Sequence, residues 1–201
     1  MGSILLAVIV LIALLVGGYV LFYNGLVASA QRVDEGWSGI TVQLKRRHDL
    51  VPNLVSSVGS AMTHERSIVS QITNARRDAM SAMNRGNPAE VSTAEAALSA
   101  SIRTFVAYSE DNPEITATAN IREMQSQLEK TEDQIAAARR IFNGNVMAYN
   151  TRVLSIPSNV VASIAGFTTR PMFELDRGEM AAVSEVPKVQ LPNAVGEARE
   201  A

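Results

Sequence analysis

The chain has 201 residues, a formal net charge of −2 and no cysteine. This charge balance gives no indication of nucleic-acid binding, and no nucleic-acid partner is predicted. The absence of thiols excludes disulfides, cysteine nucleophiles and thiolate metal sites, and the two histidines, His48 and His64, fit no metal-ligand spacing. No glycine-rich phosphate loop is present, so neither a metal nor a cofactor is expected.

The first predicted element is a membrane span at Ile4 to Phe22, nineteen residues without a charged side chain. A helix of that length crosses a hydrocarbon core of ~30 Å. Tyr19, Phe22 and Tyr23 at its end fit an interfacial aromatic anchor. The alternative is a cleaved secretory signal, because Ala28-Ser29-Ala30 has the form of a cleavage site. A retained anchor is favoured, because the apolar run is longer than a signal core and no basic residue precedes it.

The charges that flank the span predict its orientation. The short segment before it has no Lys or Arg, whereas Arg32, Lys45, Arg46 and Arg47 follow it. The positive-inside rule therefore favours a cytoplasmic C-terminal domain, although the last three cations lie just over twenty residues past the membrane, where the rule is weaker.

An apolar stripe from Val33 to Ala82 is the strongest pattern in the chain. Taken at alternating steps of four and three, thirteen of its fifteen positions are apolar, and Arg47 and Glu65 are the exceptions. This heptad pattern predicts one long helix whose stripe must be covered by the rest of the chain or by other copies. Pro52 is expected to kink this helix, because proline removes a backbone bond and clashes with the preceding turn. The stripe keeps its phase across Pro52, which favours a kinked continuous helix over a break at His48 to Pro52.

Two turns with an Asn-Pro step divide the rest of the helical part. In Arg85-Gly-Asn-Pro88, Gly86 fits a helix C-cap, Asn87 an N-cap and Pro88 a first helical turn. A second helix of about twenty residues is predicted to run to Ser109. Glu110-Asp-Asn-Pro113 is predicted to be the next turn.

A third helix is predicted from about Ile115 to Leu154. Its stripe repeats every seven residues, at Ile121, Leu128, Ile135, Phe142, Tyr149 and Ile156. The small residues Ala138 and Gly144 are expected to allow close approach of a neighbour. Two long helices with matching heptads and a shorter one between them predict an all-α fold: an N-terminal transmembrane helix followed by an elongated antiparallel bundle of three to four long helices.

After the stop at Ser155-Ile-Pro157, the segment Ser158 to Phe167 is apolar and uncharged. It could cap the bundle end, lie at a membrane interface or contact another subunit. A cap is favoured, because the segment lacks the charged face of an interfacial helix. The predicted division is an anchor at 1–23, a bundle at 24–167 and an extended or disordered tail at 168–201.

The interval Lys45-Arg46-Arg47-His48-Asp49 is the most unusual chemistry in the chain. One interpretation is a contact surface for a partner or for anionic lipid. The favoured alternative is a solvated helix face on which Asp49 pairs with Lys45 and Arg47 extends out of the stripe. If Arg47 is buried instead, it needs a carboxylate partner, for which Glu132 and Asp133 are candidates.

Other polar residues give no sign of catalysis. Asn53 is predicted to bond the carbonyls that Pro52 frees, which is a structural role. His48 and Asp49 point about 100° apart on a helix and form no ready acid–base pair. Neither a Ser-His-Asp set nor a carboxylate dyad emerges from the spacing, so an enzyme is not expected.

Several motifs resemble a bacterial LemA family protein. They are Arg32-Val-Asp-Glu-Gly-Trp37, Val42-Gln-Leu-Lys-Arg-Arg-His-Asp-Leu-Val-Pro-Asn-Leu54, Asn112-Pro-Glu114, Leu128-Glu-Lys-Thr-Glu132, Ile135-Ala-Ala-Ala-Arg-Arg140 with Phe142-Asn143, Tyr149-Asn-Thr-Arg-Val153, Ile156-Pro157 and Gly166-Phe167. The match covers about Phe22 to Phe173. The resemblance implies a single-pass protein of the bacterial inner membrane, with a short outward N-terminus and a helical bundle inside. It implies no catalytic residues, and it points to an association with membrane metallopeptidases or other envelope machinery.

Two functions are therefore predicted. The first is a membrane-tethered structural or scaffolding protein that self-associates through its long helices, with membrane lipid and other copies of itself as partners. The alternative is an adaptor or regulator of a membrane enzyme that docks on Lys45 to Asp49.

Overall fold

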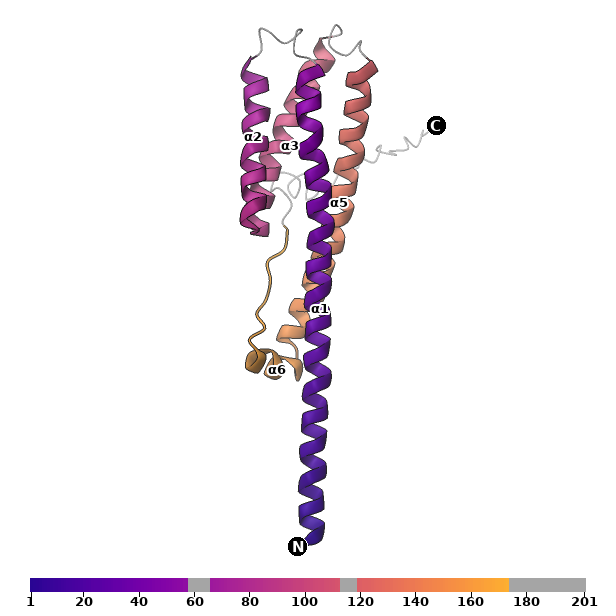
Figure 1. The fold of residues 1–201 in the computed structure, drawn as a ribbon, viewed down its shortest axis with the longest axis vertical. Helices are drawn as coiled ribbons and strands as arrows, with labels where there is room; N and C mark the ends of the chain where they lie inside the picture. Colours follow the sequence, from indigo (N-terminus) through magenta and orange to yellow (C-terminus); the bar gives the residue numbers. More distant parts are fainter. Residues whose placement is uncertain (58–65, 113–118, 174–201) are drawn as a thin grey trace, which may run out of the picture.

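The computed structural model describes residues 1–57, 66–112 and 119–173 of the chain. Within these ranges the chain is helical and contains no strand, which confirms the predicted all-α class. The helices are α1 (Gly2–Ser57), α2 (Arg66–Arg85), α3 (Pro88–Asp111), α5 (Ala119–Leu154) and α6 (Ser158–Ala165). Figure 1 shows the long helices side by side along one axis, with the N-terminal part of α1 projecting alone from one end.

α1 combines the predicted anchor and the start of the predicted bundle in one uninterrupted helix of 56 residues. Its first part, including Ile4 to Phe22, is almost entirely exposed, whereas its second part is buried along one stripe. The buried apolar positions of that stripe are Leu26, Val33, Ile40, Leu44, Val51 and Leu54. At ~1.5 Å per residue, α1 extends for ~84 Å, so the projecting part and the packed part share one rigid axis.

The predicted continuous helix from Val33 to Ala82 is wrong, because α2 lies beside α1 instead of extending it. Arg76 Nε donates a hydrogen bond to the backbone oxygen of His48 over 2.6 Å, across 28 residues of sequence. In a single straight helix these residues would be ~42 Å apart. A heptad stripe reports which face of a helix is buried and not the direction of the chain, so it persists through a reversal. Residues 58–65, which lie between the two helices, are outside the described part of the chain.

Pro52 lies inside α1, and the predicted kink there is not confirmed. The stretch His48 to Pro52 is helical, so the alternative of a break in that interval is wrong. α1 follows nearly one axis in Figure 1.

α5 runs antiparallel to α1. Arg152 Nη1 donates to the backbone oxygen of Gly25 over 2.8 Å, and Asn145 Nδ2 donates to that of Arg32 over 2.8 Å. Residue numbers therefore rise along α1 as they fall along α5. The predicted stripe of α5 is buried at Ile121, Leu128, Ile135, Phe142 and Tyr149.

Two predictions about α5 need correction. Ile156 is 84% exposed, because α5 ends at Leu154 and the stripe ends with it. Gly144 is exposed, and a Cβ placed on it would meet nothing within 4 Å. The close approach is instead made by Gly36 on α1, where a Cβ would lie 3.1 Å from the Cα of Phe142.

The turn between α2 and α3 has the predicted chemistry. Gly86 has a φ of 76°, in the left-handed region that glycine adopts freely. The side chain of Asn87 accepts a hydrogen bond from the backbone nitrogen of Ala89 over 3.0 Å, as an N-cap does, and Pro88 occupies the first turn of α3.

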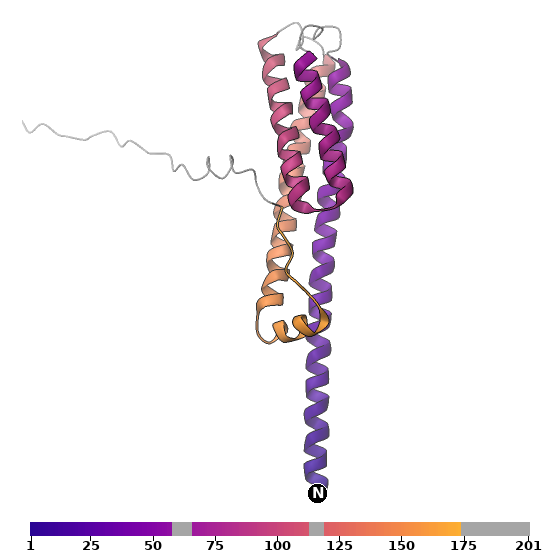
Figure 2. The same ribbon diagram turned by 90° about the vertical axis from the view of Figure 1, so that its left-hand side faces the viewer.

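The described chain ends in a segment, Thr168 to Phe173, that packs against α5. Asn150 and Asn143 each form paired side-chain bonds with the backbone of Arg170 and Phe173, respectively, at 2.9 Å. Figure 2 shows the segment running back from α6 alongside α5. Phe173 is only 4% exposed, so the start of the predicted tail belongs to the core. Residues 174–201 are outside the described part, and the division at 23 and 167 stays a prediction.

Candidate functional site

The interval Lys45 to Asp49 is divided between the interior and the surface of the bundle. Arg47 and His48 are 1% and 2% exposed, whereas Lys45, Arg46 and Asp49 are exposed. Arg47 therefore does not extend out of the stripe, and neither it nor His48 can meet a partner or lipid in this conformation. Within the described residues, Lys45 and Asp49 form no ion pair, so that part of the favoured interpretation is also wrong.

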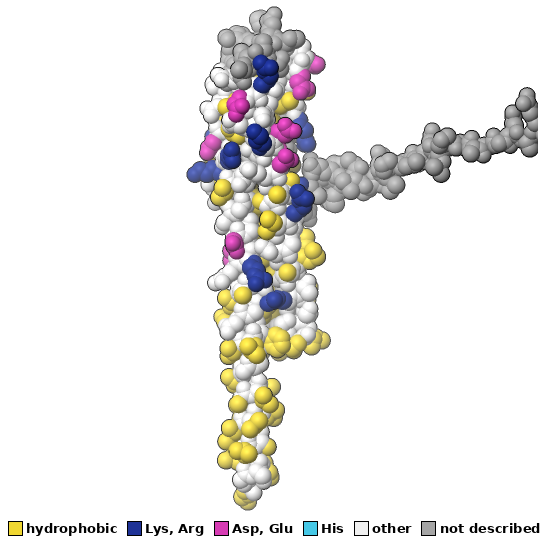
Figure 3. All heavy atoms as spheres, turned by 90° about the vertical axis from the view of Figure 1, so that its right-hand side faces the viewer, with side chains coloured by type: hydrophobic (Ala, Val, Ile, Leu, Met, Phe, Trp, Pro, Cys, Tyr) yellow, Lys and Arg dark blue, Asp and Glu magenta, His cyan; other side chains and the backbone are white. Residues whose placement is uncertain are grey.

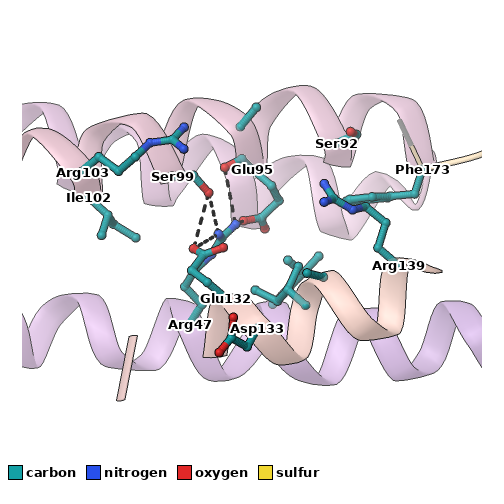
Figure 4. Close-up of a pocket in the computed structure, with 14 residues that line it drawn as sticks. Arg47, Ser92, Glu95, Ser99, Ile102, Arg103, Glu132, Asp133, Arg139 and Phe173 are labelled. Atoms are coloured by element: carbon teal, nitrogen blue, oxygen red, sulfur yellow. Dashed lines mark hydrogen bonds and ion pairs between the residues drawn. The ribbon is translucent and has the colours of Figure 1, made fainter. Parts of the chain in front are cut away.

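Arg47 joins α1 to two other helices. Its Nη2 forms an ion pair with Glu95 of α3, and its Nη1 forms one with Glu132 of α5. Nη1 also donates to Ser99 Oγ over 2.7 Å. Figure 4 shows the guanidinium between α3 and α5 with these acceptors around it. The predicted carboxylate partner Glu132 is present, and Asp133 makes no ion pair with Arg47.

His48 completes the cluster from the neighbouring position on α1. Its Nε2 lies 2.7 Å from Glu95 Oε1, so the two oxygens of Glu95 face His48 and Arg47 separately. Its backbone oxygen accepts the bond from Arg76 of α2. We call Arg47, His48, Glu95, Ser99 and Glu132 the Arg47 cluster. When the bond to Arg76 is included, the consecutive residues Arg47 and His48 of α1 contact α2, α3 and α5.

The charges of the cluster support one another. Burial alone would lower the pKa of Arg47, but the carboxylates of Glu95 and Glu132 outweigh it and raise that pKa. Burial alone would raise the pKa of Glu95, but the hydrogen bond to His48 and the charge of Arg47 lower it. A carboxylate with a lowered pKa and both oxygens engaged is a weak proton acceptor. The arrangement is therefore suited to holding helices together and poorly suited to acid–base chemistry.

Sequence reasoning missed Glu95, although a signal for it exists. The buried face of α3 repeats at steps of four and three through Val91, Glu95, Leu98, Ile102 and Phe105. Glu95 thus interrupts the apolar stripe of α3 as Arg47 interrupts that of α1. Since isolated buried charges are strongly unfavourable, two opposite interruptions on adjacent helices predict an ion pair.

A groove of about 340 Å³ lies beside the cluster, between α3 and α5. Its lining includes Arg47, Glu95 and Glu132, with Arg103 and Arg139 from the two flanking helices (Figure 4). In the part of the chain that the structure describes, no group of three or more His, Asp or Glu side chains could hold a metal ion. The groove is therefore a mixed-charge surface.

The remaining predicted site residues lie on α1. Pro52 and Asn53 are exposed, and the predicted bonding of Asn53 to freed carbonyls stays a prediction. Tyr19 and Tyr23 stack with ring centroids 6.1 Å apart, and together with Phe22 they are 38–39% exposed at the end of the projecting part of α1. By length and composition α1 can cross a membrane, and none of its most apolar window is buried in the protein.

Comparison with known proteins gives one family and several relatives. The family model described as LemA family matches residues 36–191. The chain is 25% identical over 176 residues to Magnetosome protein MamQ 2 of Paramagnetospirillum magneticum, and the same figures hold for its MamQ 1. It is 24% identical over 169 residues to Magnetosome protein MamQ of Magnetospirillum gryphiswaldense.

These alignments cover 76%, 76% and 72% of this chain and 64%, 64% and 62% of the respective relatives, so the chain spans less than two thirds of their length. The family match covers more than half of the chain, and it includes the Arg47 cluster and the groove beside it. The resemblance seen in the sequence motifs is thereby confirmed: the chain belongs to the LemA family.

Proposed function

We propose that this protein is a non-enzymatic, membrane-anchored scaffold that holds a rigid helical body at a fixed height above a bacterial inner membrane, with the body in the cytoplasm. The observation that carries the proposal is the uninterrupted course of α1 from the exposed apolar segment into the packed bundle. Because an α-helix is stiff over this length, the body has one preferred distance and tilt relative to the anchor.

The Arg47 cluster supports a structural role for the body. It joins α1 to α3 through a buried ion pair and to α5 through a partly exposed one, and the neighbouring bond to Arg76 adds α2. Such a network fixes the relative position of the helices.

Self-association is a further part of the proposal, but the α1 stripe no longer requires it. The stripe is covered by other helices of the same chain, so no second copy is needed to bury it. The mass of the detergent-solubilised protein tests this part, and a monomer alone would exclude it.

Fixed height can be measured directly. A donor dye is attached to Val42→Cys on α1, and energy transfer to acceptor lipids is recorded in vesicles; the absence of native cysteine makes the label unique. A narrow distribution of distances is expected for the intact chain. A flexible Gly-Ser insertion after Asn24 should broaden it, because the insertion uncouples the body from the span. A broad distribution in the intact chain would exclude a rigid scaffold.

A second candidate is an adaptor for a membrane enzyme, favoured by the groove between α3 and α5 and by the exposed cations Lys45 and Arg46. Reversing the charge at Arg46 and Arg103 should then release a membrane-protein complex that the intact chain forms, as seen on native gels. Arg77→Glu on the exposed face of α2 is the matched control. Identical complexes with all variants would exclude the adaptor.

A further inference from the structure

We infer that α6 and the turn before it form a second membrane contact, seated in the interfacial layer of the lipid bilayer beside the span of α1. This inference rests on the proposed anchoring by α1. It assigns the lipid bilayer as the partner of an apolar segment for which the sequence analysis favours a cap on the end of the bundle.

α6 lies at the level where the span of α1 ends. The ring of Phe167, just after α6, contacts the ring of Tyr23 with centroids 5.8 Å apart. Arg152, near the end of α5, bonds the backbone of Gly25, two residues after Tyr23. Figures 1 and 2 show the same arrangement: beyond α6 only α1 continues toward the N-terminus. A bilayer that holds Ile4 to Phe22 therefore has its surface at α6.

The surface at this level is apolar. The exposed fractions are 84% for Ile156, 70% for Ile164, 68% for Leu154 and 58% for Val160. Figure 3 shows hydrophobic side chains along the edge of the wide body that faces the projecting part of α1. The sequence between Arg152 and Arg170 has no charged side chain. An apolar surface continuous with a membrane span needs no other occupant, whereas in water it would favour aggregation.

The missing charged face of α6 is explained by its packing. An isolated interfacial helix needs a polar face toward water. Here the opposite face is covered by protein, because Val161 and Ala162 are buried against the core while Val160 and Ile164 point outward. α6 therefore has one face for the bundle and one for the lipid, and the objection raised by its sequence no longer holds.

Arg152 gives the contact its polar rim. One of its nitrogens bonds Gly25 just past the end of the span, which is the level of the lipid headgroups. A guanidinium has five N–H donors in a fixed plane, so it can bond a lipid phosphate while it keeps the contact with α1. Apolar side chains below and an arginine above match the layering of the bilayer interface.

Site-specific labels test the inference in the full chain. Single cysteines at Ile164 and Ile156 carry an environment-sensitive nitrobenzoxadiazole dye, and the protein is reconstituted into phosphatidylcholine vesicles with or without doxyl-labelled lipid. Both positions are highly exposed in the protein, so the substitutions should leave the fold intact; circular dichroism checks this. Blue-shifted emission and loss of most of the fluorescence on adding doxyl lipid are expected at both positions.

Two further positions make the outcomes distinct. Val42 is also apolar and is 63% exposed, but it lies nineteen residues past Tyr23, ~28 Å along the helix. A dye on Val42→Cys should therefore not be quenched by doxyl lipid. Leu15→Cys in the span should be quenched most strongly. Quenching at Leu15 with none at Ile164 and Ile156 overturns the inference and leaves the anchor intact. A blue shift at Ile164 without lipid quenching indicates contact with a second copy, and also overturns it. No quenching at Leu15 overturns the anchor and this inference together.

Discussion

Arg47 of α1 and Glu95 of α3 form an ion pair inside the bundle, where their side chains are 2% and 4% exposed. Each lies on the buried stripe of its own helix, and the other positions of both stripes are mainly apolar. Both side chains are almost completely buried, so loss of Glu95 leaves the buried charge of Arg47 balanced by Glu132 alone. The pair therefore fixes which residue of α3 faces which residue of α1 more strictly than apolar contacts would.

Removing the charge of Glu95 should destabilise the fold strongly. Glu95→Gln keeps the size of the side chain but leaves Arg47 with only Glu132 as a charged partner. The expected loss is about 3–5 kcal/mol of unfolding free energy, as for other broken buried pairs, measured by chemical denaturation in detergent. The control is Glu90→Gln on the same helix, whose ion pair with Arg85 is exposed and should cost less than about 1 kcal/mol. Equal losses in both variants would contradict a structural role for the buried pair.

The same pair predicts how stability depends on pH. The pKa of Glu95 in the folded protein is lowered from its usual 4.5, because the bond to His48 and the charge of Arg47 outweigh burial. A carboxyl with a lowered folded pKa adds stability above its unfolded pKa and loses it as pH falls through the folded value. Unfolding free energy should therefore fall as pH drops below about 4.5.

Glu95→Gln serves as the control for that pH dependence. Its side chain does not titrate, so its stability curve should be flatter than that of the intact chain over the same pH range. Arg47 and His48, which contact position 95, and Glu132, which contacts Arg47, are present in both proteins and contribute equally to both curves. If the unfolding free energy of both proteins fell equally with pH below about 4.5, Glu95 would not be the group responsible for the loss of stability in acid.

Sequence reasoning recovered the helices but not the reversal between them. Apolar periodicity over Val33 to Ala82 reports a buried face, and that face is buried whether the chain continues or folds back. The turn at Gly86 to Pro88 was predictable because its chemistry is local: a left-handed glycine, an asparagine cap and a proline in the first turn. Whether α2 extends α1 or lies beside it depends on long-range packing, such as the bond between Arg76 and His48.

The sequence predicts part of the candidate site. Arg47 stands out because it interrupts an apolar stripe, and Glu132 is a predicted partner. Glu95 is hard to find from the sequence because Ala94 also fits a helical stripe, three residues after Val91 and four before Leu98. Only a strict alternation of steps of four and three selects Glu95 instead. The close contact between α1 and α5 is at Gly36 and not at Gly144, because a small residue permits two helices to approach closely but does not determine where they do so.

Phe173 should hold the last described segment against the bundle. Its ring lies 5.9 Å from that of Trp37, the single tryptophan, and Asn143 bonds its backbone. Phe173→Ala removes most of a buried aromatic side chain, a loss of about 3–5 kcal/mol when the site cannot collapse. Release of the segment Thr168 to Phe173 from the bundle should cost less free energy than unfolding of the whole protein. The fluorescence emission of Trp37 should therefore shift to the red, while the helical circular dichroism signal is unchanged.

Met172→Ala is the control for that experiment. Met172 is 39% exposed and directly precedes Phe173, so its truncation should leave Trp37 emission unchanged. A red shift of the same size in both variants would mean that Phe173 has no special part in docking the segment.

Gly36 should be the tightest point between α1 and α5. A Cβ at this position would lie 3.1 Å from the Cα of Phe142 and 3.2 Å from Asn145 Nδ2. Because the first neighbour is backbone, Gly36→Ala should force the helices apart at a cost of about 1–3 kcal/mol. This cost exceeds the gain of about 0.5–1 kcal/mol that alanine normally brings to a helix interior.

Gly39, one turn along α1, isolates the effect of packing from that of helix propensity. It is exposed, and a Cβ there would meet nothing within 4 Å. Gly39→Ala should therefore stabilise the protein by about 0.5–1 kcal/mol, opposite in sign to Gly36→Ala. Thermal and chemical denaturation of both variants in the same detergent measures the sign of each change in unfolding free energy. Stabilisation by both substitutions would show that α1 and α5 separate at Gly36 without cost, and that their contact there does not set the spacing of the bundle.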